Sequence, residues 1–250
     1  MSAMTTVDEA LAAADGVDGW MSDEQIVELH RAAAATPADG RIVEIGSFRG
    51  RSTIVLATSA PSGVEVVAID PHAGNDRGPQ EIEGFTALAE DDHDRFLANL
   101  AAAGVGDRVR HVRRFSDQAH RDVGGDIDVL LIDGAHRFGP ARRDIHDWGA
   151  RVLPGGVLLI HDAFSSIGVT LAIGRELVAG RRFRYVGRAR SLAVYHADLD
   201  GTWRSRVGNA AAQLAQLPWF LRNVGLKVVL AAGLGGVVER LTGRRPEWPY

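Results

Sequence analysis

Residues 41–54 of the chain read RIVEIGSFRGRSTI, and this stretch decides the fold. Its first five residues, RIVEI, form a short run rich in β-branched side chains that is typical of a buried strand. Glycines follow at Gly46 and Gly50, and a helix-like stretch begins near Ser52. A strand, a glycine-containing turn and a helix in this order are typical of the first unit of a nucleotide-binding α/β fold.

The same alternation of apolar strands and helix-like stretches continues along the chain. Continuous apolar strands joined by helical crossovers indicate a parallel sheet covered by helices on both faces. Two later runs, near 183–187 and 192–196, are joined by a short basic turn, so we expect an antiparallel hairpin at one sheet edge. The sequence therefore predicts a Rossmann-like, doubly wound, mostly parallel seven-stranded sheet. The parallel strands are expected at residues 41–45, 64–69, 109–113, 127–132 and 157–161.

Three parts of the chain are expected: an N-terminal segment (1–19), the α/β domain (20–197) and a helical C-terminal extension (198–250). The extension contains three of the five tryptophans and a segment rich in Leu, Val, Ala and Gly. Residues 215–242 carry too much apolar surface for a free helix in water. We expect this segment to pack on the domain or to form a homo-oligomer interface. Lying on a membrane surface is less favoured, because the charges of the segment are of mixed sign.

Composition limits the possible functions. A chain of 250 residues with 46% hydrophobic and 24% charged residues fits a soluble globular protein with a full core. The net charge of −4 gives no support to a general role in nucleic-acid binding. The absence of cysteine excludes disulfides, thiolate metal sites and thiol catalysis. No signal peptide or membrane-spanning run is recognisable, so we expect a cytoplasmic protein.

Polar side chains follow each of the five predicted parallel strands. In open α/β sheets, ligands bind outside the carboxyl ends of the strands, near the point where the strand order reverses. Gly46 and Gly50 would let the backbone approach a ligand, and Ser52 could cap the following helix. Asp70 ends the second strand, 26 residues after Glu44, where a carboxylate binds ribose hydroxyls in nucleotide-binding folds. Each residue alone could be a turn residue or a helix cap, but together they favour a ligand site.

The carboxylate of Glu44 bears on the identity of that ligand. A dinucleotide dehydrogenase needs the spacing GxGxxG, so that backbone amides at a helix start bind a pyrophosphate. Here the spacing is GxxxG, and Glu44 is expected where it would repel a diphosphate. S-adenosylmethionine contains an adenosine and two cationic groups but no phosphate, so an acidic turn favours it.

Four stretches together carry a family resemblance: VEIGSFRGRSTI, the strand end at Asp70, IDGAHRF and LPGGVLLIHD. They are similar to class I S-adenosylmethionine-dependent methyltransferases, and to the bacterial branch of macrocin-type sugar O-methyltransferases, over about residues 20–197. The resemblance implies that the turn binds the methionine moiety, Asp70 the ribose, and the end of the third strand the adenine. The residues implied are Glu44, Gly46, Ser47, Gly50 and Ser52 for methionine, Ser116 and Asp117 for adenine, and Asp133 beside the donor.

The acceptor hydroxyl needs a general base or a metal ion to draw off its proton. Asp133 ends the fourth strand and Asp162 follows the fifth, so both are expected beside the methyl donor. With His161 or His136 they would form an oxygen-rich site suited to Mg²⁺. The sugar methyltransferases carry an acidic pair where this chain has His161 and Asp162, which favours Asp133 and Asp162 as the ligands. His136 is the predicted general base, because a neutral imidazole accepts a proton near pH 7; the alternative is a loop residue bonded to backbone.

The sequence therefore predicts an O-methyltransferase that uses S-adenosylmethionine, with assistance from Mg²⁺, on a hydroxyl of a sugar, glycoside or polysaccharide precursor. The resemblance implies acceptors such as the methylmannose-type polysaccharides of mycobacteria, and we expect a homodimer or larger homo-oligomer. A methyltransferase acting on a phenol or catechol and a non-catalytic nucleotide-binding module are the alternatives. The polar segment 73–85 is predicted to be either a lid or a plain surface loop.

Overall fold

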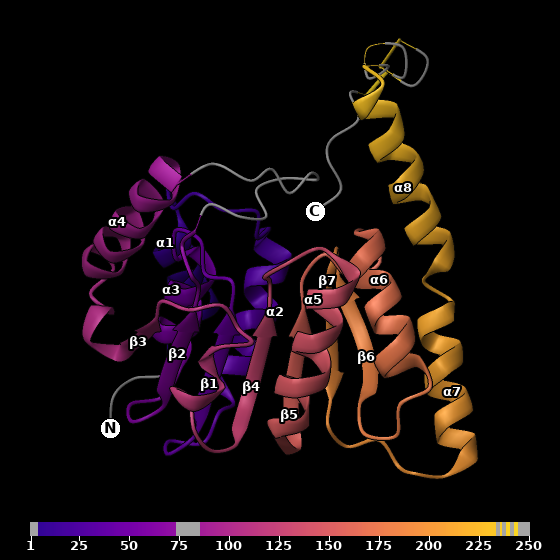
Figure 1. Cartoon of the computed structure of the whole chain (residues 1–250), viewed down its shortest axis with the longest axis horizontal. Helices are drawn as coiled ribbons and strands as arrows, with labels where there is room; N and C mark the ends of the chain where they lie inside the picture. Colours follow the sequence, from indigo (N-terminus) through magenta and orange to yellow (C-terminus); the bar gives the residue numbers. More distant parts are fainter. Residues whose placement is uncertain (1–4, 74–85, 234–235, 237–238, 241–242, 245–250) are drawn as a thin grey trace.

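The computed structural model describes residues 5–73, 86–233, 236, 239–240 and 243–244. The predicted lid therefore lies almost entirely outside the described residues. Seven strands form one sheet in the order β3-β2-β1-β4-β5-β7-β6, in which only the pairs made by β7 are antiparallel (Figure 1). This confirms the predicted fold class. The strands are β1 (Arg41–Ile45), β2 (Glu65–Ile69), β3 (Val109–Val112), β4 (Ile127–Ile132), β5 (Val152–Ile160), β6 (Arg184–Ala189) and β7 (Leu192–His196).

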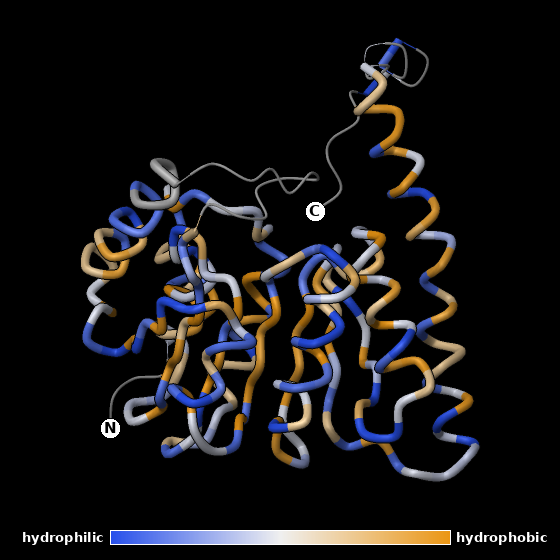
Figure 2. Tube along the Cα trace, in the orientation of Figure 1, coloured by the Kyte–Doolittle hydropathy of each residue, from blue (hydrophilic) through white to orange (hydrophobic). Residues whose placement is uncertain are grey.

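Helices cover both faces of the sheet, and each face has its own apolar core. One core joins the sheet to α1, α2, α3 and α4, and the other joins it to α5 and α6. Figure 2 shows the strands as largely apolar between these two layers. The helices are α1 (Val7–Ala14), α2 (Asp23–Ala34), α3 (Arg51–Ser59), α4 (Thr86–Ala102), α5 (Phe138–Arg143), α6 (Ile167–Ile173), α7 (Trp203–Leu214) and α8 (Leu217–Ala231).

The alternation of side chains along β1 decides which residues reach the candidate site. Val43 and Ile45 point to the core shared with α5 and α6, whereas Ile42 points to the core shared with α3. Successive strand residues face opposite sides, so Glu44 also points toward α3. The consequence for its predicted role is described below.

The strand order reverses between β1 and β4, which are parallel neighbours. Gly46 lies at this point with a left-handed backbone (φ 86°). A Cβ at this position would lie 2.3 Å from the carbonyl oxygen of Asp133, so only glycine allows the two strand ends to approach this closely. The turn after β1 and the end of β4 therefore lie together at the carboxyl edge of the sheet.

Three elements differ from their predicted form. The helix expected at 116–123 is only a short 3₁₀ turn, Ala119–Arg121. The helix expected from 140 begins at Phe138 as α5 and widens into a π-helical turn at Asp144–Trp148. Strand β5 begins at Val152, earlier than predicted, and its pairing with β4 shifts register between Val152 and Val157, where Gly155 has a left-handed backbone typical of a bulge.

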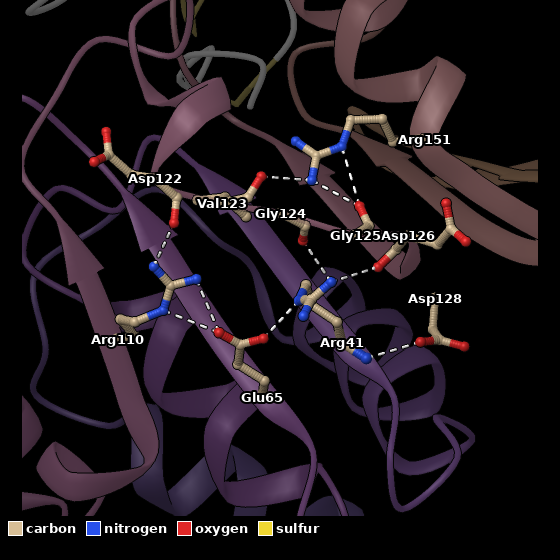
Figure 3. Close-up of polar contacts among 10 residues, drawn as sticks. All are labelled: Arg41, Glu65, Arg110, Asp122, Val123, Gly124, Gly125, Asp126, Asp128 and Arg151. Carbon is tan, nitrogen blue, oxygen red and sulfur yellow. Dashed lines mark hydrogen bonds and ion pairs between the residues drawn. The ribbon is translucent and has the colours of Figure 1, made fainter.

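The amino edge of the sheet is held by a network of arginines (Figure 3). Glu65 at the start of β2 lies between Arg41 of β1, at 2.6 Å, and Arg110 of β3, at 2.8 Å. Arg41 also donates to the carbonyl oxygens of Gly124 and Asp126 at 2.6 and 3.0 Å. Although partial burial of Glu65 favours the neutral acid, the two guanidinium groups lower its pKa. The network ties three strands to the loop before β4.

Helices α7 and α8 follow one another along the edge of the domain beyond β6, and α8 extends past the carboxyl ends of the strands (Figure 1). The predicted helical C-terminal extension is thereby confirmed. Among the residues that the structure describes, no helix combines the length and the apolar character that crossing a membrane requires.

Candidate functional site

The turn after β1 is held by the carboxylate that follows β2. The amides of Ser47 and Phe48 each donate to Asp70 Oδ2 at 2.9 Å, and the amide of His72 donates to Oδ1 at 2.7 Å. Phe48 has a left-handed backbone (φ 46°), a conformation that an aromatic residue rarely adopts. Asp70 therefore holds the turn in a strained conformation of the kind that clusters at ligand sites.

Asp70, the residue predicted to bind the ribose, keeps some access to solvent, because its side chain is 16% exposed. His72 is buried, and its Nε2 lies 2.8 Å from the Phe48 carbonyl oxygen, so it supports the turn and does not face an acceptor. The Ser47 hydroxyl is buried and has no hydrogen-bond partner in the described part of the chain. A buried hydroxyl without a partner calls for a ligand or a water molecule, which fits the predicted contact with the methionine moiety.

Arg49 fastens the same turn to two other segments. Its Nε lies 2.9 Å from Asp92 of α4, and its guanidinium also pairs with Asp18, which follows α1. The rings of Trp20 and Phe48 are in contact, with centroids 5.0 Å apart. The N-terminal segment therefore covers the outer side of the turn.

Glu44 does not line the site. Its carboxylate is fully buried and accepts hydrogen bonds from the hydroxyls of Ser52 and Thr53 in the first turn of α3. Burial raises the pKa of Glu44 to about 8, although the two hydrogen bonds favour the charged form. The prediction that Glu44 presents a negative charge to the ligand is therefore wrong. Glu44 and Ser52 instead anchor the start of α3, which follows Gly50 at its N-cap (φ 89°).

The predicted adenine side contains a carboxylic acid that the sequence analysis missed. Ser116 after β3 donates to Asp144 Oδ1 at 2.5 Å, while Asp117 is exposed. Burial raises the pKa of Asp144 to about 6 despite the hydrogen bond from Ser116. Asp144 was missed because it lies inside the helical stretch ARRDIHDW, where a carboxylate usually faces solvent. Contacts of Ser116 and Asp117 with adenine remain a prediction.

Four side chains at the ends of β4 and β5 form one continuous series of contacts. Asp133 Oδ1 lies 2.9 Å from His161 Nδ1, which lies 3.6 Å from Asp162 Oδ2. The same Asp162 oxygen is 2.7 Å from His136 Nε2. Asp133, His136 and His161 line a small pocket at this edge. The structure thus brings together the predicted base and the three predicted metal ligands.

Charge within this group alternates. Although burial disfavours the charged imidazole, the carboxylates of Asp133 and Asp162 raise the pKa of His161 to about 10. The pKa of His136 also lies above its usual 6.5, because the hydrogen bond and charge of Asp162 outweigh the effect of burial. Although burial alone would raise it, the pKa of Asp162 is held well below its ordinary value by the two histidines. At neutral pH a cationic His161 therefore lies between two carboxylates.

The predicted Mg²⁺ site does not fit this arrangement. The cationic ring of His161 lies between Asp133 and Asp162, where a metal ion would have to bind both carboxylates. Within the residues described by the structure, no group of three or more His, Asp or Glu side chains is arranged to hold a metal ion. The donor set agrees with this result, because His161 offers nitrogen where Mg²⁺ prefers oxygen ligands.

Two residues of α8, Asn223 and Lys227, lie close to this group. Asn223 of α8 is buried and donates to the carbonyl oxygen of Phe164, in the loop that begins with Asp162. Lys227 lies one turn further along the same face of α8, and its charge interacts with that of Asp162. Burial lowers the pKa of Lys227, although Asp162 opposes this. Lys227 was missed in the sequence analysis. The signal that could have found it is that Lys227 is the only lysine in a sequence with 27 arginines.

Comparison with known proteins agrees with this geometry. Residues 43–163 match the family model described as a methyltransferase domain. The fold is similar to that of cofactor-bound Rv0187 from MTB, with 21% identity, a TM-score of 0.51, and coverage of 76% of this chain and 88% of the other. It is also similar to the O-methyltransferase NovP, with 14% identity, a TM-score of 0.55, and coverage of 71% and 81%. A protein from Corynebacterium glutamicum gives 16% identity, a TM-score of 0.55, and coverage of 80% and 93%.

The matched residues contain the turn after β1, Asp70 and the predicted adenine side. They also contain all four members of the His/Asp group, which are Asp133, His136, His161 and Asp162. The candidate site therefore lies within the part of the chain that matches a methyltransferase domain.

Proposed function

We propose that the domain transfers a methyl group from S-adenosylmethionine to a hydroxyl of a sugar or glycoside, with His136 as the general base. The observation that carries the proposal is the state of the His136 ring. Its Nε2 is bonded to Asp162 at 2.7 Å, whereas its Nδ1 is buried and has no hydrogen-bond partner among the described residues. An orphaned ring nitrogen at the carboxyl edge suits a base that waits for a proton from the acceptor.

Asp162 sets the tautomer of this base. As a carboxylate it accepts a hydrogen bond from Nε2–H, so the neutral ring carries its lone pair on Nδ1. His161 and Asp133 continue the series on the other side of Asp162 and keep that carboxylate charged and oriented. This is the logic by which a third group orients a histidine base.

S-adenosylmethionine, when bound, supplies an electrophilic methyl group on a sulfonium sulfur. The acceptor oxygen attacks the methyl carbon as His136 Nδ1 takes the hydroxyl proton, and the carbon–sulfur bond breaks with its electron pair on sulfur. The chain's contribution is alignment, the tautomer of His136, and the polar groups that hold the donor. Ser47, Asp70, Ser116 and Asp117 are the residues proposed to hold it.

The acceptor class rests on two supports. The stretches IDGAHRF and LPGGVLLIHD, which carry His136, His161 and Asp162, resemble sugar O-methyltransferases. The fold is also shared with a protein named as an O-methyltransferase. A hydroxyl acceptor fits a site built around an imidazole base, because an alcohol is a poor nucleophile until its proton is drawn off.

Methyl transfer should be measured from S-adenosylmethionine to a panel of sugars, glycosides and catechols, with wild type and His136→Ala. Wild type should methylate a sugar or glycoside, and the variant should lose nearly all of that activity while still binding S-adenosylhomocysteine in calorimetry. Turnover of catechols alone would replace the sugar by a phenolic acceptor. Failure of the wild type to bind S-adenosylhomocysteine would overturn the proposed function as a whole.

A further inference from the structure

The two C-terminal helices expose an unusual share of the apolar surface. Residues 203–231 hold six of the thirteen large apolar side chains that are exposed in the described part of the chain. These six side chains are between 42% and 68% exposed. They are Trp203, Val207, Leu214, Leu217, Leu221 and Val228. Figure 2 shows apolar stretches along α8 where it extends beyond the sheet.

The face that these helices turn toward the domain is polar at its centre. The buried residues of α7 and α8 are Asn209, Gln213 and Asn223. Their amides bond to the domain: Asn209 donates to the Phe183 carbonyl oxygen at 3.1 Å, and Asn223 to that of Phe164 at 3.1 Å. Trp219 and Phe220 of α8 also pack against the core. The six exposed apolar side chains lie away from it, whereas an amphipathic helix normally keeps its apolar side against the core. The exposed apolar side is therefore available for a second contact.

The spacing of the exposed residues is that of a helix–helix seam. Val207, Leu214, Leu221 and Val228 recur at intervals of seven residues. A second apolar series with the same seven-residue interval lies between them, each member four positions before or three positions after a residue of the first series. It consists of Trp203, Ala210, Leu217, Val224 and Ala231. An apolar pattern of alternating three and four residues, sustained over four heptads, is typical of a coiled coil.

The seam continues from one helix to the next. Between α7 and α8 the backbone stays in the right-handed helical region, at Ala215 (φ −61°, ψ −12°) and Gln216 (φ −84°, ψ −8°). Glycines lie beside the seam at Gly208 and Gly225, and a Cβ at either position would meet nothing within 4 Å. A second helix can therefore approach this side closely.

We propose that residues 203–231, termed the C-terminal rod, form the interface between two copies of this chain, which pair antiparallel through the seam. A second copy fits this surface better than a membrane does. A narrow apolar stripe with alternating spacings of three and four residues is the pattern of a coiled coil, whereas a lipid surface favours a wide apolar face. A symmetric pair of copies makes such a contact isologous, so each stripe covers the other.

The positive charges of the C-terminal rod favour an antiparallel over a parallel pair. The C-terminal rod contains four basic residues and no acidic one. Arg222 lies over the ring of Trp219, with 5.3 Å to the ring centroid, and Lys227 interacts with Asp162. Arg204, which lies over the ring of Trp203 with 5.7 Å to the centroid, and Arg206 are both at one end of the seam. A parallel pair would bring these two arginines of both copies together. In an antiparallel pair the two copies of these arginines are about 33–39 Å apart along the axis, several times the ~8 Å screening length at physiological salt.

The antiparallel pair predicts one self-contact. The midpoint of residues 203–231 is Leu217, which would lie opposite Leu217 of the second copy. Because the chain has no cysteine, Leu217→Cys provides a single thiol at that point. Ala212→Cys, which is exposed but lies off the seam, is the matched control. Mild oxidation should join Leu217→Cys chains into a covalent dimer and leave Ala212→Cys chains single, because a disulfide needs Cα atoms about 4.4–6.8 Å apart.

Sedimentation equilibrium of the full chain gives the second readout. Wild type should have about twice the chain mass of 26.8 kDa, and Leu214→Glu combined with Leu221→Glu should raise the dimer dissociation constant at least ~100-fold. Ala212→Glu should not change it. Both leucines are exposed in the single chain, so the circular dichroism spectrum of the double variant should match that of the control.

A monomeric wild type at ~50 µM, or equal crosslinking of the two cysteine variants, would overturn the proposal. So would a monomer that sediments with anionic phospholipid vesicles, since that result would make the seam a membrane contact.

Discussion

The two edges of the sheet use the same kinds of charged residue in opposite ways. At the amino edge, Arg41 and Arg110 enclose Glu65 and bond to carbonyl oxygens, so permanent cations face a carboxylate (Figure 3). At the carboxyl edge, carboxylates face imidazoles, and His136 Nδ1 is left without a described partner. Arginine cannot give up its proton in a protein, whereas histidine can. The first edge can only hold strands together, and the second can also move a proton.

The largest effect is expected at the carboxyl edge, when the proposed base is removed. His136→Ala should lower kcat/KM for methyl transfer about 10²–10⁴-fold, the range for loss of a positioned general base. The His136 side chain is partly exposed, so the melting temperature should change little. Calorimetry with S-adenosylhomocysteine should give wild-type affinity. A variant with wild-type turnover would assign the base elsewhere.

Asp162→Asn tests whether the carboxylate positions the base. The amide cannot hold the Nε2 proton in the same way, so we expect a loss of roughly 10–100-fold in kcat/KM. Because Asp162 raises the pKa of His136, the substitution should also move the acidic limb of the pH–rate profile to lower pH. A purely structural role would lower the rate without moving that limb.

The wild-type pH profile provides a related test. A base works only when neutral, so activity should rise with pH through the pKa of His136, which lies above the usual 6.5. His161, with a pKa of about 10, should stay charged over this range. A rate that is flat from pH 5 to 8 would remove His136 as the titrating base.

Glu44 separates stability from catalysis at the carboxyl edge. Its folded-state pKa of about 8 lies above the ordinary 4.5, so between these values the folded state keeps a proton that the unfolded chain has lost. Stability should therefore fall as pH rises from 4.5 to 8, by at most about 1.4 kcal/mol per pH unit. Glu44→Gln should unfold in urea with a flatter pH dependence over that window. Identical pH dependence of variant and wild type would contradict the raised pKa.

The amino edge should give the smallest effect. Glu65→Gln removes a partly exposed carboxylate from between two arginines, and such pairs stabilise by about 0–1 kcal/mol. We expect a loss of about 1 kcal/mol or less in urea unfolding, and unchanged kcat/KM. A large loss of activity would mean that the two edges are coupled.

The sheet could be predicted from the sequence, because apolar residues repeat differently in strands and in helices. The polar residues at the strand ends, Asp70, Asp133 and Asp162, were also recognisable. The sequence also placed Asp133 and Asp162 at one edge of the sheet, since parallel strand ends share one edge. The direction of Glu44 was wrong, although the alternation within RIVEI could have shown that its neighbours Val43 and Ile45 face the opposite layer. Pairing of His161 with two carboxylates could not be predicted, because it depends on side-chain distances across two strands.

The C-terminal helices show a different limit. Their apolar content was recognised from the sequence, but the heptad spacing was not separated from ordinary packing. Only the structure shows that Asn209, Gln213 and Asn223 face the domain while the seam faces outward.

We propose that the Asp133–His161–Asp162–His136 group carries out methyl transfer to a hydroxyl without a metal ion. The most direct measurement is the initial rate of methyl transfer from S-adenosylmethionine to the best sugar acceptor, in the presence of a chelator and then of added Mg²⁺. We predict the same rate in both conditions, and a loss of that rate in His136→Ala. A rate that disappears with the chelator and returns with Mg²⁺ would contradict the account.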